Sequence, residues 1–486
     1  MPPIPFDNTY ARLPERFFTS TPPTPVRSPR VIRLNRPLAA QLGIDADALD
    51  ATAIFSGNQI PDGAQPISQA YAGHQFGSFV PRLGDGRAVL LGEVVDRSGV
   101  RRDLQLKGAG RTPWSRGGDG RAAIGPVLRE YVVSEAMFAL GIPTTRSLAA
   151  VTTGEVVVRE ELLPGAVLTR VASSHMRVGT FEYFIARGDT EGIRTLADYV
   201  LARHYPDAAR AERPYHALLD AVIHAQAELI AKWLLVGFIH GVMNTDNMSV
   251  AGETIDYGPC AFMDEYDPNT VFSSIDRHGR YAYGNQPAIG GWNLTRFAET
   301  LLPLLAVDTD AAIADANAAL TAYAPALDRA YVAGLRRKLG LFTEEADDII
   351  LAQELLKAMH ENRADFTNTF RRLSDAGAGN SSAVRTSFRD PSAYDAWEQR
   401  WLARLAQESI DPAERRDAMR RVNPAYIPRN HRVEAVIRAA TDANDFAPFE
   451  ELTTLLEHPF DDQPQLARYA EPPQEEERVL QTFCGT

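Results

Sequence analysis

Cysteine, long apolar runs and positive charge are all scarce in this chain of 486 residues. Its two cysteines, Cys260 and Cys484, are too few for a disulfide framework, and their separation excludes a Cys-x-x-Cys metal or redox pair. No apolar run reaches the roughly 18 residues that a membrane helix needs, and the first residues lack a basic and then apolar leader. We therefore expect a cytoplasmic protein that does not span a membrane.

The balance of charge argues against polyanionic partners. Acidic side chains outnumber basic ones by 63 to 50, which gives a formal net charge of −13. A protein of that charge has little sequence-independent affinity for nucleic acid or for an anionic membrane, so we expect neither as a partner. The sequence leaves the oligomeric state open, and a monomer is the default expectation.

Lysine is rare as well, because only four of the 50 basic residues are lysines and the rest are arginines. The four are Lys107, Lys232, Lys338 and Lys357. Such a bias usually reflects genome composition. It nevertheless makes a lysine in a strand conspicuous, and Lys107 ends the strand-like stretch DLQLK.

The strands and helices expected from the sequence follow the order found in a protein kinase. The stretches AVLLGEVVD and DLQLK, the second alternating polar and apolar residues, precede a helix expected at about 126–140. Two further strands, SLAAVTT and EVVVREE, flank a turn expected at Gly154. After Arg187 the apolar residues recur every three or four positions, as in helices. We predict an α+β, protein-kinase-like bilobal fold, in which a small mixed sheet lobe precedes a large helical lobe.

These changes of texture divide the chain into four parts. They are an irregular, Pro-rich wrapping segment at 1–65, a kinase-like N-lobe at 66–185, a kinase-like helical C-lobe at 186–375 with an active-site loop at 240–268, and a helical C-terminal extension and tail at 376–486. One short helix, around Leu38 to Leu42, is expected in the first part.

The stretch HGVMNTDNMSV at 240–250 is close to a kinase catalytic loop. In the kinase pattern H-R-D-L-x-x-x-N, the Asp accepts the substrate proton and the Asn holds a metal. His240 and Asn247 keep that spacing, but Val242 stands where the Asp belongs. Asp246 is the nearest carboxylate and is the candidate to accept the proton instead. The alternative is that Asp246 caps the loop or binds metal in an inert protein.

Transfer from ATP also needs metal ligands and a cation that contacts the phosphates. Asp256, in a DYG triplet nine residues after Asn247, supplies a second oxygen ligand for Mg²⁺. Lys107 has the position of the kinase strand lysine, and Glu130 on the next helix is its expected partner. Glu135 is a rival partner on another face of that helix. An ordinary surface lysine and glutamate are the alternative to the whole pair.

The string GDGRA occurs twice, in LGDGRAVLLG at 83–92 and in RGGDGRAAIG at 116–125. The first copy has the place of a glycine-rich loop between strands, and its simpler alternative is an Asp-Gly hairpin turn. The second copy follows Lys107, where its backbone N–H groups and Arg116 or Arg121 can meet a phosphate.

Two further arginines extend this set of cations. Arg170 and Arg177 stand in VLTRVASSHMRVG, between the second expected strand pair and the helical half. A guanidinium suits bidentate contact with phosphate. Because most arginines of this chain are expected at the surface, these two depend on their context for a functional interpretation.

Five blocks together resemble the selenoprotein O family, and they span most of the chain. They are YAGHQFGSFVPRLGDGRAVLLGE (71–93), LKGAGRTPWSRGGDGRA (106–122), SEAMFALGIPTTRSL (134–148), HGVMNTDNMSV with TIDYGPCAFMDEYDP (240–268) and NPAYIPRNHRVEAVIRAA (423–440). The resemblance implies a pseudokinase that binds ATP flipped relative to ordinary kinases. It also implies transfer of AMP, rather than phosphate, to Ser, Thr or Tyr hydroxyls of proteins.

The resemblance assigns roles to the candidate residues. It implies that Lys107 and Glu130 form an ion pair, that Asp246 accepts the proton, and that Asn247 and Asp256 hold Mg²⁺ or Mn²⁺. The residues implied to line the nucleotide site, besides Lys107, are Gly84, Gly86, Arg87, Asp119, Gly120, Arg170 and Arg177. With ATP inverted, the α-phosphorus faces the acceptor. The proton then leaves away from the usual position of the kinase base, so Val242 at that position does not prevent the reaction. Whether UTP replaces ATP stays open.

The chain differs from animal members of that family at its end, where Cys484-Gly485-Thr486 leaves no place for selenocysteine. Because Cys260 follows the DYG triplet, we hypothesise that a Cys260–Cys484 disulfide regulates access to the site, with two free thiols as the alternative. Two other functions also stay open, a conventional kinase that transfers the γ-phosphate and a nucleotide-binding scaffold without turnover.

Overall fold

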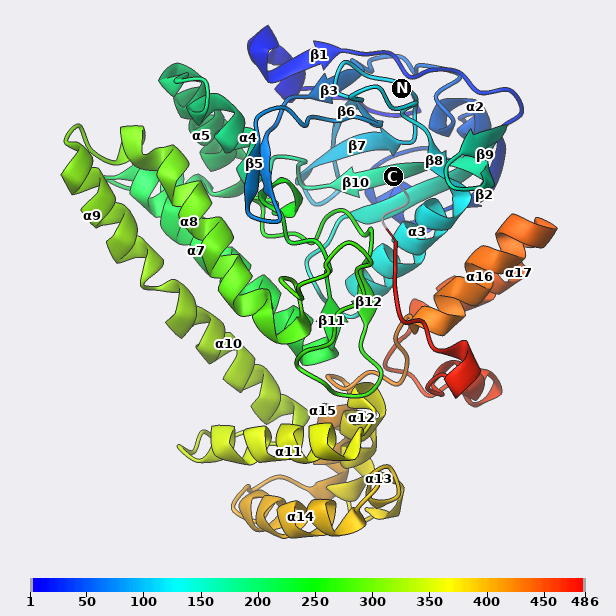
Figure 1. The fold of residues 1–486 in the computed structure, drawn as a ribbon, viewed down its shortest axis with the longest axis vertical. Helices are drawn as coiled ribbons and strands as arrows, with labels where there is room; N and C mark the ends of the chain where they lie inside the picture. The colour runs from blue at the N-terminus through cyan, green and yellow to red at the C-terminus, as the bar shows by residue number, and fades with distance from the viewer. Residues whose placement is uncertain (1–2, 484–486) are drawn as a thin grey trace.

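The computed structural model describes residues 3–483 and has a mixed α/β architecture. A large sheet forms the first part of the chain, and helices extend away from it (Figure 1). Its strands are β1 (Phe18–Ser20), β2 (Arg30–Leu34), β3 (Ile67–Gln69), β6 (Ala88–Val95), β7 (Arg101–Lys107), β8 (Ala122–Ala123), β9 (Arg146–Val158) and β10 (Leu162–Ala172). Two small ribbons, β4 (Gly73–Gln75) with β5 (Ser78–Val80) and β11 (Phe238–Ile239) with β12 (Ala261–Phe262), stand apart from it.

Helices occur along the described chain and predominate after β10. They are α1 (Arg36–Gln41), α2 (Ala51–Phe55), α3 (Ile124–Ala139), α4 (Val178–Ile185), α5 (Thr190–His204), α6 (Pro206–Ala209), α7 (Pro214–Val236), α8 (Gln286–Leu305), α9 (Thr309–Leu320), α10 (Tyr323–Lys338), α11 (Asp348–Asn362), α12 (Phe366–Ala376), α13 (Ser382–Arg385), α14 (Pro391–Leu405), α15 (Pro412–Arg420), α16 (Asn430–Ala443) and α17 (Ala447–Leu456). The predictions of a helix at about 126–140, of a short helix around Leu38 to Leu42 and of helical structure after Arg187 are confirmed.

The sheet has the order β1-β3-β6-β7-β10-β9-β2, with β8 paired to β10, and its neighbouring strands are antiparallel. Both edge strands, β1 and β2, come from the segment expected to wrap the protein at 1–65. That segment therefore completes the sheet by hydrogen bonding as well as lying over it. Main-chain groups at both margins of the sheet are satisfied by the start of the chain.

The expected turn at Gly154 is wrong, because β9 runs without a break from Arg146 to Val158. Gly154 has φ +66°, and a Cβ there would lie 2.6 Å from the Cβ of Ser28. The register with β10 also shifts between Pro164 and Ala166. The glycine therefore marks an irregularity inside one long strand, where left-handed backbone passes close to another segment.

β7 also departs from the alternation that predicts one solvent-facing side. Leu104 and Leu106 are buried, but Asp103 and Gln105, which alternate with them, are buried as well. Asp103 accepts hydrogen bonds from the His175 backbone and ring, and Gln105 Nε2 lies 3.3 Å from a buried carboxylate. Polar side chains are tolerated on this face because each finds a hydrogen-bond partner there, and Gln105 also lines the candidate site.

Helix α3 lies between the sheet and the end of the chain. One side of α3 packs on the sheet, and α16 and α17 cover its other side (Figure 1). Val433 and Phe449 of these helices share a buried cluster with Leu128 of α3. The predicted helical C-terminal extension therefore returns to the first part of the chain and fixes the helix that carries Glu130.

The long helix α7 ends at Gly237, which has φ +72° and caps the helix in the left-handed conformation. A Cβ at this position would lie 3.0 Å from Phe366, so the turn leaves little room for a side chain. The chain then passes through β11 into the loop 240–250. No helix within residues 3–483 is long and apolar enough to cross a membrane.

Lys338, the last residue of α10, is buried among aromatic rings. Its Nζ lies 4.3 Å from the ring centre of Phe370 and 5.6 Å from that of Phe366. It has no carboxylate partner within the described residues, and burial lowers its pKa to about 7. The unfolded chain, where a lysine has a pKa near 10.4, therefore holds a proton that the folded protein loses above about pH 7.

We predict that Lys338→Met raises the free energy of unfolding by a few kcal/mol at pH 7, because the variant buries no amine. Between about pH 7 and 10 the unfolded wild type binds more protons than the folded form, so the stability of the wild type rises with pH and the advantage of the variant shrinks. Urea denaturation across this range measures both effects. The control is Lys357→Met, whose ammonium is exposed; an advantage of Lys338→Met that does not shrink with pH contradicts the prediction.

Candidate active site

A cavity of about 700 Å³ lies at the ends of β6, β7 and β10 and is closed on its other side by the loop 240–259. Polar groups from segments far apart in the sequence meet in it. Of the residues that the sequence nominated, it is lined by Gly84, Gly86, Arg87, Lys107, Asp119, Gly120, Arg170, Arg177, Asp246, Asn247 and Asp256. Residues nominated from separate parts of the sequence therefore line one cavity.

A buried cluster of charges forms the back of this cavity. Lys107 Nζ lies 2.5 Å from Glu130 Oε2 and 3.3 Å from Asp256 Oδ1. Arg170 donates from Nε to Glu130 Oε1 at 2.7 Å and from Nη2 to Asp256 Oδ1 at 2.6 Å. Arg170 therefore joins both carboxylates, and it links α3 to the DYG segment through β10.

Arg177 completes the cluster from the start of α4. Its Nη1 donates to the backbone oxygen of Asp246 at 2.8 Å and lies 3.2 Å from Asp256 Oδ2. The guanidinium also lies 4.3 Å from the ring centre of Tyr71. Burial alone would raise the pKa of Asp256, but Arg170, Lys107 and Arg177 outweigh it and hold that pKa well below its usual range.

The rival glutamate is engaged elsewhere. Glu135 accepts hydrogen bonds from the guanidinium of Arg146 at 2.8 and 2.6 Å and from the backbone of Ser147. It therefore binds the start of β9, whereas Glu130 meets Lys107. The expectation that these two glutamates use different faces of the helix is confirmed.

The loop 240–250 is fixed by its own hydrogen bonds. His240 is buried, and its Nε2 lies 2.9 Å from the backbone oxygen of Ile255. Asn247 donates from Nδ2 to the backbone oxygen of Val242 at 3.0 Å, which leaves its carbonyl oxygen for another partner. His240 thus holds the loop beside the DYG segment, while Val242 contributes an apolar wall and a backbone acceptor.

Asp246 is a buried carboxylate with one oxygen that has no hydrogen-bond donor. It is buried, and burial raises its pKa to about 6 even though Arg177 opposes the shift. Its Oδ2 accepts a hydrogen bond of 3.3 Å from Gln75 Nε2, but its buried Oδ1 has no donor. A Cβ on Gly73 would lie 2.6 Å from this Oδ1, so the β4–β5 ribbon packs directly against the carboxylate.

The segment before the second GDG copy packs against the first copy. Gly84 has φ +70°, and a Cβ there would lie 2.3 Å from the ring of Trp114. Ser115 Oγ donates to the backbone oxygen of Gly86, and Thr112 Oγ1 donates to that of Asp85 at 2.7 Å. The segment before the second copy therefore holds the first copy in place.

The second copy is itself held at the mouth of the cavity. Gly120 has φ +70°, and a Cβ would lie 2.0 Å from the backbone oxygen of Gly110, so only glycine fits this approach. Asp119 pairs with Arg159 at 2.9 Å. Arg116 and Arg121, the two arginines considered for phosphate, both line the cavity.

Asn247 and Asp256 could together supply two oxygen ligands to a divalent cation. Within residues 3–483 no group of three or more His, Cys, Asp or Glu side chains is suited to a metal. Asn247 and Asp256 line the same cavity, and an octahedral Mg²⁺ takes its other ligands from water and phosphate oxygens. Asp256 has φ +63°, a conformation that is uncommon for a residue other than glycine.

The sequence did not single out several residues that shape the site. They are Gln75 and Phe76 of the β4–β5 ribbon, Asp85 of the first GDG copy, Trp114 and Asn244. Asp85 is buried, which raises its pKa to about 6. The signal that could have found Gln75, Phe76 and Trp114 is the combination of glycines with aromatic residues in YAGHQFG and GRTPW.

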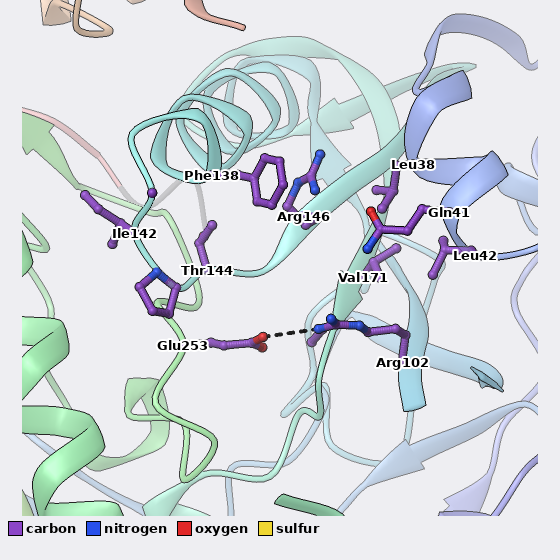
Figure 2. Close-up of a pocket in the computed structure, with 13 residues that line it drawn as sticks. Leu38, Gln41, Leu42, Arg102, Phe138, Ile142, Thr144, Arg146, Val171 and Glu253 are labelled. Carbon is purple, nitrogen blue, oxygen red and sulfur yellow. Dashed lines mark ion pairs between the residues drawn. The ribbon is translucent and has the colours of Figure 1, made fainter. Parts of the chain in front are cut away.

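A second cavity, of about 320 Å³, lies between α1, the end of α3 and β10 (Figure 2). Its charged side chains already have partners, since Arg102 faces Glu253 at 3.6 Å and Arg146 binds Glu135. The guanidinium of Arg146 also lies 3.3 Å from the ring centre of Phe138. This cavity therefore offers no uncompensated charge for a nucleotide.

Only one of the two cysteines lies within the described residues. Cys260 is buried beside the site loop, and Cys484 lies outside the described residues. Thr482 donates from Oγ1 to the backbone oxygen of Pro259 at 2.6 Å and pairs with Ser273. The tail thus reaches the residue next to Cys260, while the disulfide stays a prediction.

Comparison with known proteins identifies the family. Residues 3–457 match the family model described as "Protein adenylyltransferase SelO". This chain belongs to the SelO family. Among its relatives are proteins named "Protein nucleotidyltransferase YdiU" from Bradyrhizobium sp. (strain ORS 278), 67% identical, and from Methylorubrum extorquens, 64% identical; each alignment covers 99% of both chains. The match confirms the family that the five sequence blocks indicated.

Within this SelO-family site, we predict that Arg170→Met destabilises the fold more than Lys107→Met does. Losing Arg170, whose side chain is 3% exposed, leaves the buried Glu130 and the half-buried Asp256 short of a cation and costs about 3–5 kcal/mol. Lys107→Met costs less, because Arg170 still pairs with both carboxylates. Denaturant unfolding measures the difference.

The control for this comparison is Arg400→Met, which removes an arginine from an exposed pair with Glu354. Its effect on the free energy of unfolding should be small. Equal losses for Arg170→Met and Lys107→Met would contradict the prediction, because they would show that Arg170 has no bridging role.

Proposed function

We propose that this chain is a protein adenylyltransferase, which transfers AMP from ATP to Ser, Thr or Tyr hydroxyls of proteins and releases pyrophosphate. The names of its family and relatives support the class of reaction. The observation that carries the proposal is the pairing of Val242, at the place of the kinase base, with a buried Asp246 whose Oδ1 has no donor. A carboxylate displaced in this way suits a nucleotide that lies in the reverse orientation.

The chemistry balances with the groups present. The acceptor oxygen attacks the α-phosphorus, the bond from that phosphorus to the bridging oxygen breaks, and pyrophosphate leaves with the electron pair. Asp246 accepts the hydroxyl proton at Oδ1, and its pKa near 6 leaves it ionised at neutral pH. Lys107 and Arg170 offset the negative charge that grows on the leaving group.

The remaining residues bind and orient the nucleotide. Asn247 and Asp256 would hold Mg²⁺ or Mn²⁺, which neutralises phosphate charge when bound. Gly84, Gly86 and Gly120 let the two loops pack closely against Trp114 and Gly110, where a Cβ would collide. In this arrangement backbone N–H groups of the loops can face the phosphates. Arg87, Asp119 and Arg177 lie around the same cavity.

The proposal includes the arrangement of the chain. We assign the sheet region at 66–185 to a kinase-like N-lobe and 186–375 to a kinase-like helical C-lobe, with the site between them. The support is the order of elements, in which a strand lysine precedes a helix glutamate and then a His-x-x-x-x-x-x-Asn loop. The Lys107–Glu130 contact is the pairing that this fold uses around ATP.

The first test follows the label from ATP labelled at the α- or the γ-phosphate. We expect protein labelling from the α-phosphate alone, and intact-mass spectrometry should show the addition of AMP. Asp246→Asn should lower kcat roughly 100- to 10,000-fold, because the variant cannot accept the proton. The matched control, Asp442→Asn on the surface of α16, should keep full activity.

Each other result has a clear meaning. Label from the γ-phosphate alone would establish a conventional kinase. Binding of ATP with no label from either position would establish a scaffold without turnover. Full activity in Asp246→Asn would remove this residue from the reaction while leaving the transfer of AMP intact.

A second test uses the ribbon that presses on Asp246. Gly73→Ala places a methyl group within 2.6 Å of Oδ1 and 2.9 Å of the Asp246 Cβ, so the carboxylate must move. A displacement of about 1 Å at a reacting group costs on the order of 100-fold in rate. We expect kcat to fall by this factor with cooperative thermal unfolding retained. Unchanged kcat would show that the position of Asp246 does not limit the reaction.

A further inference from the structure

A groove of about 610 Å³ adjoins the candidate active site on the side of the β4–β5 ribbon. Phe76 and Ile275 line both this groove and the main cavity, so one space opens into the other. The groove is otherwise formed by the turn 276–280 and the start of α8. None of the nucleotide-binding residues proposed above lies in it.

The apolar part of the groove is accessible. Ile275 is 51% exposed and Phe76 is 37% exposed, although both are large apolar side chains. The backbone of Phe76 has φ +52°, and its N–H donates to Asn244 Oδ1 at 3.0 Å. Its ring lies 5.2 Å from that of Tyr281. Phe76 is therefore held in an uncommon conformation that keeps its ring between the two spaces.

The polar part of the groove is basic. Arg277 and His278 are exposed at the turn, and Arg280 lies over the ring of Trp292 at 4.9 Å. Within the described chain neither arginine forms an ion pair with a carboxylate, and Arg280 Nε has no hydrogen-bond partner. Most other arginines near this site are paired, as Arg170 and Arg177 are.

The one acidic side chain of the groove is already engaged. Asp276 is buried, and its two oxygens accept the backbone N–H groups of Arg280 and Tyr281 at 2.9 and 2.7 Å. It therefore fixes the shape of the turn and does not neutralise the guanidiniums. In a chain with a net charge of −13, this leaves a local positive surface beside the reacting groups.

We propose that this groove binds an acidic stretch of the acceptor protein next to the hydroxyl that receives AMP. Carboxylates of the acceptor contact Arg277 and Arg280, and an apolar side chain near the hydroxyl contacts Phe76 and Ile275. The inference rests on the proposed function for the identity of the partner. Charge complementarity and the shared boundary with the Asp246 cavity select an acceptor segment over a second nucleotide.

The test compares two fluorescent peptides of equal length that both contain Ser, Thr and Tyr, one flanked by Glu residues and one by Lys residues. Fluorescence anisotropy with the full chain measures binding without requiring turnover. We expect the acidic peptide to bind about tenfold more tightly, with a preference that falls as salt is raised. The same order should appear in KM when AMP is transferred.

Charge reversal provides the decisive variant. Arg277→Glu should weaken binding of the acidic peptide about five- to tenfold and strengthen binding of the basic one, because one attraction becomes a repulsion. The control is Arg389→Glu, an equivalent reversal at an exposed arginine just before α14. It should leave both affinities unchanged.

The outcomes separate this inference from the proposed function. If the wild type binds both peptides equally, or Arg277→Glu changes neither affinity, the groove is not an acidic docking site even where AMP transfer is observed. If the acidic preference and its reversal are found but no AMP is transferred, the groove stands and the proposed function fails. Displacement of the acidic peptide by an oligonucleotide of equal length and concentration would overturn the assignment to a protein acceptor.

Discussion

The contact on which the site depends is Arg170 between Glu130 and Asp256. A guanidinium that is almost completely buried must have its charge compensated, and two carboxylates from different parts of the chain do so. The same contact brings helix α3, strand β10 and the DYG segment into one arrangement. Lys107 and Arg177 also pair with Asp256. The positions of Lys107, Arg170 and Arg177 are therefore determined by one shared carboxylate.

The first GDG copy and the β4–β5 ribbon are held in place by contacts with neighbouring segments. The first GDG copy is fixed by Trp114 and Ser115 from the segment before the second copy. The β4–β5 ribbon packs closely against Asp246 because Gly73 has no side chain that would collide with the carboxylate. His74 adds to this contact, since its backbone N–H donates to Thr245 Oγ1 at 2.6 Å. The glycines therefore bring backbone to the reacting groups at short range.

The sequence allowed much of this to be predicted. Local patterns located the strand that ends in Lys107, the helix with Glu130 and the loop with Asp246, because periodicity and motif spacing are local properties. They did not predict that Asp103 and Gln105 would be buried, since that depends on His175 and Arg170 from elsewhere in the chain. Nor did they show that Phe76 and Ile275 line a common boundary, because about 200 residues separate them.

Segments from the two ends of the described chain contact distant parts of the fold, which determines when these contacts can form during synthesis. The first residues supply both margins of the sheet, Arg33 of β2 binds Glu450 and Glu457 near the end, and Thr482 joins the segment beside the DYG triplet. A chain that ends before residue 450 lacks these partners. The edge strand β2 and the segment beside the DYG triplet therefore gain these contacts only after residues 450–482 have been synthesised.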